Sequence, residues 1–96
     1  MNILISYEVN TTEPEGQRRL RHVAKICQDY GQRVQASVFE CTLTQKELVV
    51  LKYRLKTIID EATDSIRIYK LSQNRDKGIE CFGKNTSYNP EGILII

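Results

Sequence analysis

Apolar and polar side chains alternate along the first nine residues of the chain. A period of two is typical of a strand with one buried face, and the apolar members here are Ile3, Ile5, Tyr7 and Val9. The sequence therefore predicts an opening strand that ends close to Glu8.

A helix is predicted next. Thr12 and Glu15 have the spacing of a capping box, and Pro14 suits a first helical turn, where its missing N–H costs nothing. We therefore expect the helix to begin near residue 13 and to end at Gly31, in the left-handed conformation that glycine favours. The apolar residues between these limits repeat every 3.6 positions and form one stripe: Leu20, Val23, Ala24, Cys27 and Tyr30.

Residues 33–43 are rich in β-branched and aromatic side chains, which predicts two short strands that turn near Ala36 and Ser37. Thr44 and Glu47 then repeat the capping-box spacing. A second amphipathic helix should follow and end near residues 60–61. Its apolar stripe consists of Leu48, Leu51, Leu55 and either Ile58 or Ile59.

Residues 64–71 predict a fourth strand, with Ile66 and Ile68 on one face and Arg67 and Tyr69 on the other. A polar turn is expected at 73–76, and residues 79–82 suit an edge strand. The order β-α-β-β-α-β predicts an α+β, ferredoxin-like fold, in which two helices cover one face of an antiparallel sheet. At 96 residues, with 41% hydrophobic side chains, the chain is expected to form one domain over residues 1–96.

The chain ends in a four-residue apolar run that is costly to leave in water. We expect this run to add as a strand to the sheet of a second copy, giving a reciprocal homodimer with an extra C-terminal strand. The alternative is that it pairs within its own chain. The residues are Ile93, Leu94, Ile95 and Ile96.

No apolar run exceeds four residues, and the first residues lack the basic segment of a signal peptide, so a cytoplasmic location is expected. Cys27, Cys41 and Cys81 are odd in number and widely spaced, which indicates buried thiols rather than disulfides or a zinc site. The formal charge of +2 is too small to indicate a nucleic-acid partner by itself.

The positions of the basic residues are more informative than their number. Arg19 lies at the border of the first helix's apolar stripe, and Arg33 follows the helix. Arginine-rich faces suit phosphate backbones, and the alternative is a solvated face balanced by Glu15 and Asp29. The residues opposite the apolar stripe are Arg18, Arg21, His22 and Lys25.

Glu8 is the candidate metal ligand. One carboxylate does not make a site, but two copies of Glu8 meeting at a two-fold axis could hold Mg²⁺, with Ser6 or Ser37 ordering water. The alternative is a solvated carboxylate at the end of a strand. Since His22 is the single histidine, neither a His-rich metal cluster nor a Ser-His-Asp triad is available.

Four segments carry a resemblance to a known family: ISYEVN, RRLRHVAKICQDYGQRVQASVFEC, DSIRIYKL and the closing GILII. They resemble the Cas-two (Cas2) family of CRISPR adaptation proteins, most of all its subtype I-C members, and the resemblance spans nearly the whole chain. It implies a ferredoxin-like homodimer that binds double-stranded DNA and bridges dimers of the Cas-one (Cas1) integrase while new spacers are acquired. The integrase performs the strand transfers in that assembly.

Members of this family are also described as metal-dependent endonucleases that act on single-stranded RNA or double-stranded DNA. Glu8 stands where the family has an aspartate that binds Mg²⁺ or Mn²⁺ together with its copy in the partner, and Tyr7 lies beside it. Because glutamate adds a methylene, the resemblance supports DNA bridging more directly than cleavage. It also associates Arg19, Arg21 and Arg33 with nucleic-acid contact, and Ser37 and Phe39 with the centre of the dimer.

Two other functions compete with the bridging role. One is a standalone magnesium-dependent endoribonuclease or endodeoxyribonuclease resembling a toxin interferase. The other is a ferredoxin-like small-molecule sensor, which would need a polar interface pocket with a clear ligand motif. The arginine face and the apolar terminal strand favour the nucleic-acid functions.

Overall fold

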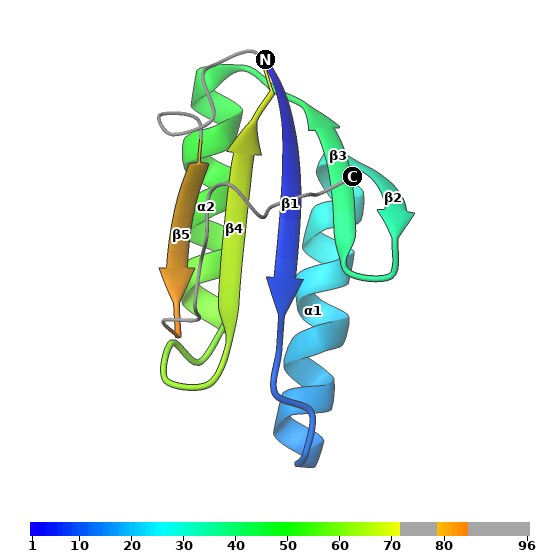
Figure 1. The fold of residues 1–96 in the computed structure, drawn as a ribbon, viewed down its shortest axis with the longest axis vertical. Coiled ribbons are helices and arrows are strands. Elements are labelled where there is room, and N and C mark those ends of the chain that lie inside the picture. The colour runs from blue at the N-terminus through cyan, green and yellow to red at the C-terminus, as the bar shows by residue number, and fades with distance from the viewer. Residues whose placement is uncertain (72–78, 85–96) are drawn as a thin grey trace.

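The strands and helices follow the predicted β-α-β-β-α-β order, with the predicted edge strand added (Figure 1). The structure is a computed structural model that describes residues 1–71 and 79–84. The turn predicted at 73–76 and the terminal strand predicted at 93–96 lie outside these residues. The described elements are β1 (Asn2–Glu8), α1 (Pro14–Tyr30), β2 (Gly31–Gln35), β3 (Val38–Thr42), α2 (Gln45–Ile58), β4 (Ser65–Lys70) and β5 (Ile79–Gly83).

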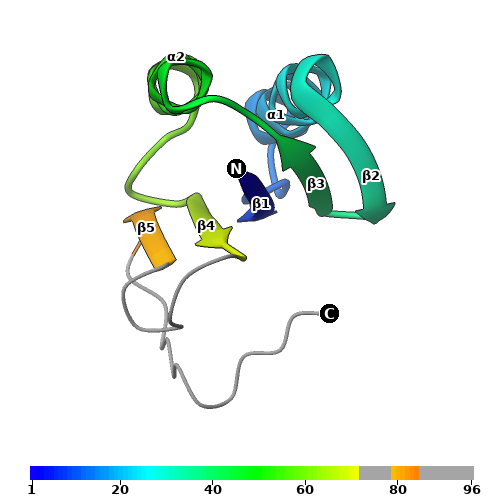
Figure 2. The same ribbon diagram turned by 90° about the horizontal axis from the view of Figure 1, so that it is seen from above.

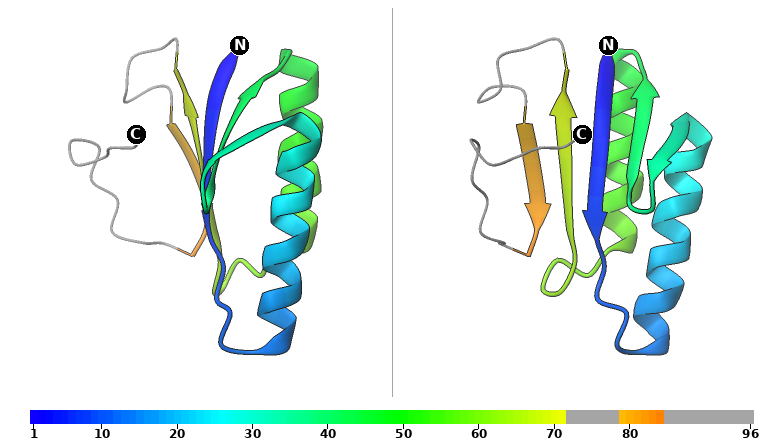
Figure 3. Two further views of the ribbon diagram at one scale, coloured as in Figure 1. Left: turned by 90° about the vertical axis from the view of Figure 1, so that its right-hand side faces the viewer. Right: turned by 45° about the vertical axis from the view of Figure 1, so that its right-hand side comes forward.

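The strands form one antiparallel sheet in the order β2-β3-β1-β4-β5, so β1 lies at its centre. Both helices pack on the same face of this sheet (Figures 2 and 3). The predicted α+β class and its two-layer arrangement are therefore confirmed. Neither described helix combines the length and hydropathy needed to span a bilayer.

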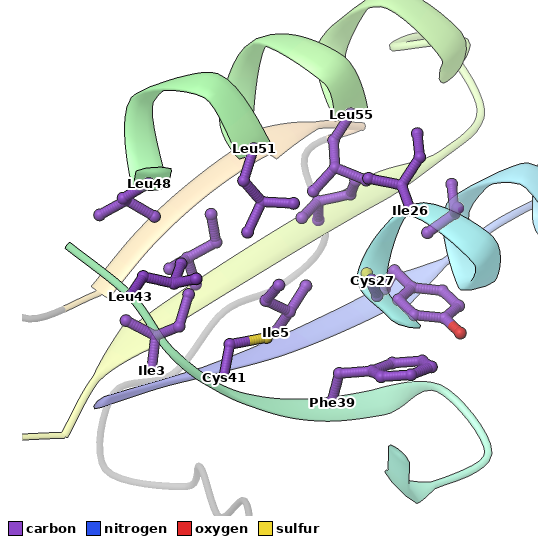
Figure 4. Packing of buried hydrophobic residues seen from close by; sticks show 14 of the residues in the cluster. Ile3, Ile5, Ile26, Cys27, Phe39, Cys41, Leu43, Leu48, Leu51 and Leu55 are labelled. Carbon is purple, nitrogen blue, oxygen red and sulfur yellow. The ribbon is translucent and has the colours of Figure 1, made fainter. Parts of the chain in front are cut away.

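The core lies between the helices and the inner face of the sheet (Figure 4). Its β1 members are Ile3 and Ile5, which are fully buried, and Tyr7, which is 2% exposed. Leu51 and Leu55 of α2 pack onto them from above. Each fully buried aliphatic side chain contributes about 1.5–3 kcal/mol, so this alternation fixes which face of β1 turns toward the helices.

The predicted capping box is correct for α2 and wrong for α1. Thr44 accepts a hydrogen bond from the backbone of Glu47, and the Glu47 side chain accepts one from the backbone of Thr44. At α1 the cap residue is Glu13, and no side chain caps the helix. The Thr12 amide and hydroxyl both donate to Asn10 Oδ1, at 3.0 and 2.8 Å, because the loop turns around Asn10 before the helix begins.

Gly31 does not adopt the predicted left-handed conformation. Its φ of −167° and ψ of −157° are extended, and α1 passes directly into β2. Glycine is required for a different reason: a Cβ atom would overlap the backbone oxygen of Glu40 and lie 2.6 Å from Cys41 Sγ. The second helix ends at Ile58, two residues before the predicted limit.

Candidate nucleic-acid and metal site

Glu8 is the last residue of β1, the central strand in Figure 1, and its side chain is exposed. A depression of about 520 Å³ surrounds it. Oxygen-bearing side chains dominate this depression, and one lysine, Lys84, also lines it. The lining residues are Tyr7, Glu8, Val9, Asn10, Thr11, Thr12, Leu20, Ser37, Thr63, Ser65 and Lys84.

The oxygen atoms in this depression suit a hard divalent cation. Mg²⁺ prefers oxygen ligands and is bound through one or two carboxylates together with water and phosphate. Glu8 supplies a carboxylate, and Ser37 and Ser65 supply hydroxyls. Within residues 1–71 and 79–84, no three His, Cys, Asp or Glu side chains cluster to hold a metal. The residues therefore fit Mg²⁺ or Mn²⁺ if a second chain adds its own Glu8.

The loop that follows Glu8 is anchored on Asp64, a fully buried carboxylate. Its Oδ1 accepts hydrogen bonds from the Asn10 backbone and the Thr63 hydroxyl, both at 3.0 Å, and its Oδ2 accepts one from the Asp60 backbone at 2.9 Å. Burial alone would raise the pKa of Asp64, but these bonds and the one from Arg19 outweigh burial and lower it. Asp64 is therefore a carboxylate near neutral pH.

Arg19 differs from the other arginines of α1 because it has a partner inside the chain. Its Nε donates to Asp64 Oδ2 at 2.8 Å, and its Nη2 donates to Asp64 Oδ1 at 3.3 Å. The guanidinium is thus committed to a structural ion pair. The contact of Arg19 with nucleic acid stays a prediction. Its Nε and Nη2 groups already donate hydrogen bonds to Asp64.

The predicted basic face of α1 exists as an exposed surface. None of its side chains forms a hydrogen bond or ion pair with another residue in the described part of the chain. Asp29, one of the two acids expected to balance this face, is bound instead by Arg54 of α2, at 3.1 Å. The four exposed side chains are Arg18, Arg21, His22 and Lys25.

Tyr7 and Phe39 belong to the core of a single chain. Their rings stack with centroids 6.1 Å apart, and the Arg33 guanidinium lies 5.1 Å from the Phe39 centroid. Burial raises the pKa of the Tyr7 phenol, and a hydrogen bond with Arg33 opposes this in part. Tyr7 is therefore a protonated packing residue near pH 7. Its role in catalysis stays a prediction.

The two residues predicted for the dimer centre, Ser37 and Phe39, differ in their exposure. Phe39 is 0% exposed within one chain, so its side chain has no surface left for a partner. Ser37 is half-buried and lines the depression beside Glu8, and its backbone oxygen accepts a hydrogen bond from the Tyr7 amide at 3.1 Å. Ser6, the alternative water-ordering residue, does not line this depression.

The three thiols are free, but only two are buried as predicted. Burial raises the pKa of Cys27 to about 12 and that of Cys41 to about 11. Cys81 is exposed on the face of the sheet that lacks helices, opposite Arg67 of β4. The expectation of three buried thiols is therefore wrong for Cys81, because edge strand β5 presents this side chain outward.

Comparison with known proteins identifies the family. The profile of the family described as CRISPR associated protein Cas2 matches residues 1–79. The chain belongs to the Cas2 family. A Cas2 of Nitratidesulfovibrio vulgaris, named a CRISPR-associated endoribonuclease, is 49% identical over 96 residues, which are 100% of this chain and 94% of that protein.

Two further Cas2 proteins are similar over most of their length. One from Halalkalibacterium halodurans, named a CRISPR-associated endonuclease, is 48% identical and covers 99% of each chain. The crystal structure of Streptococcus pyogenes Cas2 at pH 6.5 superimposes with a TM-score of 0.71 and 59% identity, over 83% of this chain and 96% of that one. The α+β fold predicted from the order of the elements is thus matched by a solved Cas2 structure, and the family that the four segments resemble is the one to which the chain belongs.

The structure brings some of the predicted site residues together and separates others. Glu8 and Ser37 share one depression, whereas the exposed basic residues of α1 do not line it. Asp64 and Lys84 were not singled out from the sequence. The Gly83-Lys84 pair after the predicted edge strand was the available signal for Lys84, while nothing local indicated that Asp64 would meet Arg19.

Proposed function

We propose that two copies of this Cas2 chain form a homodimer that binds double-stranded DNA and bridges Cas1 integrase dimers during spacer acquisition. The observation that carries the proposal is the exposed basic face of α1. Arg18 and Arg21 lie there one turn apart with no partner among the described residues. Such groups bind phosphates by releasing counterions and by donating paired hydrogen bonds, which requires no base sequence.

The acidic residues of the chain neutralise the basic face of α1 less than the net charge of +2 suggests. Asp29 is bound by Arg54, so it does not offset Arg21 or Lys25. A dimer places two such faces on one particle and doubles the number of phosphates that it can reach. This supports the bridging function over a solvated, functionally neutral helix face.

The second face of the sheet supports the homodimer. Leu4 pairs in register with Tyr69 across β1 and β4, and Val38 of β3 pairs with Ser6, two residues further along β1. The side chains of Leu4, Tyr69 and Val38 are half-buried, and no described helix covers this face. Joining two such faces removes this apolar surface from water. The proposal includes exchange of residues 93–96 between the two chains, which the apolar run and the family resemblance both favour. The resemblance adds assignment to subtype I-C, and the sequence favours a cytoplasmic location.

Metal-dependent endonuclease activity is a second candidate function. Relatives carry the names endoribonuclease and endonuclease, and Glu8 lies in a depression that is rich in oxygen atoms. Bound Mg²⁺ or Mn²⁺ would lower the pKa of a water and neutralise charge on a phosphate of DNA or RNA. Glu8 would act as a ligand of the ion, and Ser37 would orient water.

The test of the bridging function combines assembly with acquisition. Light scattering measures the mass of the particle that the chain forms, with and without the Cas1 of the same CRISPR locus. Spacer acquisition is measured by counting new spacers in cells. We expect a dimer, a larger complex with Cas1, and loss of acquisition when Arg18, Arg21 and Lys25 are changed to Ala. Normal acquisition in that strain, with the protein present at wild-type level, would contradict the proposal. Lys46→Ala is the matched control, since Lys46 lies exposed at the start of α2.

A further inference from the structure

We propose that Lys84 binds a phosphate of the nucleic-acid strand that passes Glu8, so that both residues act on one sugar–phosphate backbone. The proposal rests on the proposed function, because it assumes that nucleic acid reaches this end of the sheet. It assigns a role to a residue outside the arginine face of α1. It also defines the ligand as a phosphodiester strand of any sequence.

Strand register places the two residues near one another. Glu8 of β1 pairs with Ser65 of β4, and Ser65 pairs with Gly83 of β5. Adjacent strands lie about 4.8 Å apart, so the backbones of Glu8 and Gly83 are separated by roughly 10 Å. Lys84 follows immediately, and a lysine side chain, when extended, is long enough to span a large part of that distance.

The backbone at Lys84 is held in place rather than left free. Gly83 has a φ of +102°, which glycine adopts readily, and a Cβ atom there would overlap the backbone oxygen of Asp64. The Lys84 amide donates to the same Asp64 oxygen at 2.6 Å. Asp64 therefore anchors both Lys84 and, through its carboxylate, the loop after Glu8.

Charge and surroundings favour a phosphate as the ligand. Glu8 and Lys84 line the same depression of about 520 Å³, and neither forms an ion pair with a residue in the ranges 1–71 and 79–84. An ammonium group binds phosphate as a point charge from several directions. A carboxylate alone repels phosphate and requires a divalent cation between them, so Lys84 supplies the attraction that Glu8 lacks.

The test is binding of a fluorescent random-sequence duplex to the full chain, followed by anisotropy over a range of salt concentrations. Lys84→Ala should weaken binding about three- to tenfold and reduce the slope of log K against log salt by about 0.9 for each phosphate that the variant no longer neutralises. Lys84→Arg should retain most of the affinity. Lys46→Ala is the control at the opposite end of the sheet and should bind like the wild type.

The outcomes separate this proposal from the proposed function. If Lys84→Ala binds like Lys46→Ala while Arg21→Ala binds weakly, Lys84 has no phosphate contact and the DNA-binding function stands. If the wild-type chain binds no duplex, both are rejected. Joint action with Glu8 requires that the effects of Glu8→Ala and Lys84→Ala be non-additive in Mg²⁺ and additive in EDTA. Additivity in both buffers overturns it.

Discussion

Arg19 and Asp64 form a two-point ion pair that joins α1 to the start of β4, with contacts of 2.8 and 3.3 Å. Asp64 is fully buried, and three further donors complete its hydrogen bonds. Its backbone oxygen also accepts the Lys84 amide. One residue therefore organises the loops on both sides of Glu8, at the end of the molecule where we propose that nucleic acid binds.

Removing this carboxylate should destabilise the fold. Asp64→Ala leaves Arg19 and two backbone amides without their acceptor, and each buried donor that loses its acceptor in this way costs about 1–3 kcal/mol. Urea unfolding at equal chain concentrations measures the loss, because dimer formation makes apparent stability depend on concentration. Glu61→Ala is the control, since Glu61 is exposed nearby. Equal midpoints for the two variants would contradict a structural role for Asp64.

The same group predicts a pH dependence. The pKa of Asp64 is lower in the folded chain than in the unfolded chain. The contribution of the Asp64 carboxylate to stability is therefore fully present above its ordinary pKa of about 4. It is lost as the pH falls through the lower, folded-state pKa. Urea midpoints measured from neutral to strongly acidic pH should therefore fall less for Asp64→Asn than for the wild type. Parallel curves would show that Asp64 does not titrate differently on folding.

Alanine variants of Arg19 and Arg21 should differ in their effects on stability and on duplex binding. Arg21 is exposed without a partner among the described residues, so Arg21→Ala should weaken duplex binding about three- to tenfold and leave the unfolding midpoint unchanged. Arg19→Ala should also lower the unfolding midpoint, because it leaves Asp64 without its cation. Anisotropy and urea unfolding of the same preparations measure both effects. An Arg21 variant that binds normally would remove α1 from the nucleic-acid surface.

Features that depend on nearby residues were predicted correctly from the sequence. The alternation at Ile3 and Ile5 and the capping box at Thr44 each involve residues a few positions apart, so the pattern itself contains the cause. Thr12 has the same spacing to an acid as Thr44 and does not cap its helix. The difference is Asn10, whose side chain binds Thr12 first.

Features that depend on distant residues were missed or misassigned. Gly31 looked like a helix stop, whereas its requirement comes from the close approach of β3 at Glu40. Arg19 was placed at the border of the apolar stripe and associated with nucleic-acid contact, whereas Asp64 binds it from 45 positions further along the chain. Such contacts appear only when the sheet and helices are assembled, which is why the fold was predicted better than the site.

Glu8 should control any cleavage without controlling DNA binding by α1. We expect Glu8→Ala to abolish Mg²⁺- or Mn²⁺-dependent cutting of labelled duplex DNA and single-stranded RNA, and to leave spacer acquisition intact. The physical reason is that Glu8 is the carboxylate among the described residues that line the depression, whereas the basic face lies on α1, outside the depression. EDTA-treated protein is the control for metal dependence. Loss of spacer acquisition in a Glu8→Ala strain would contradict the separation of the two roles.

Glu8→Asp tests whether the extra methylene matters. The shorter carboxylate restores the residue that the family resemblance associates with metal, and it brings the charge closer to the backbone. We expect cutting by Glu8→Asp to equal or exceed that of the wild type in the same assay. If the wild type cuts and the Glu8→Asp variant does not, this site requires the longer side chain.

Cys81 can report which face of the sheet forms the dimer. Cys27 and Cys41 are buried, with pKa values raised to about 12 and about 11, so neither should react with iodoacetamide at mildly alkaline pH in the folded protein. Cys81 is exposed in the single chain, on the face without helices, although partial burial raises its pKa as well. We expect one modified thiol per chain, and none in Cys81→Ser until urea is added.

The concentration dependence of this reaction tests the proposed interface. If two chains join through the faces that carry Leu4 and Tyr69, dimer formation covers the face on which Cys81 lies, and the rate of modification should fall as protein concentration rises. Mass spectrometry follows the rate, and light scattering gives the dimer fraction in the same samples. A rate that stays constant while the dimer fraction rises would place the interface elsewhere. A sheet edge or the helix-covered side would then be the surface that the partner chain occupies, and a partner on the helix-covered side, with α1 and its basic face, would compete directly with DNA.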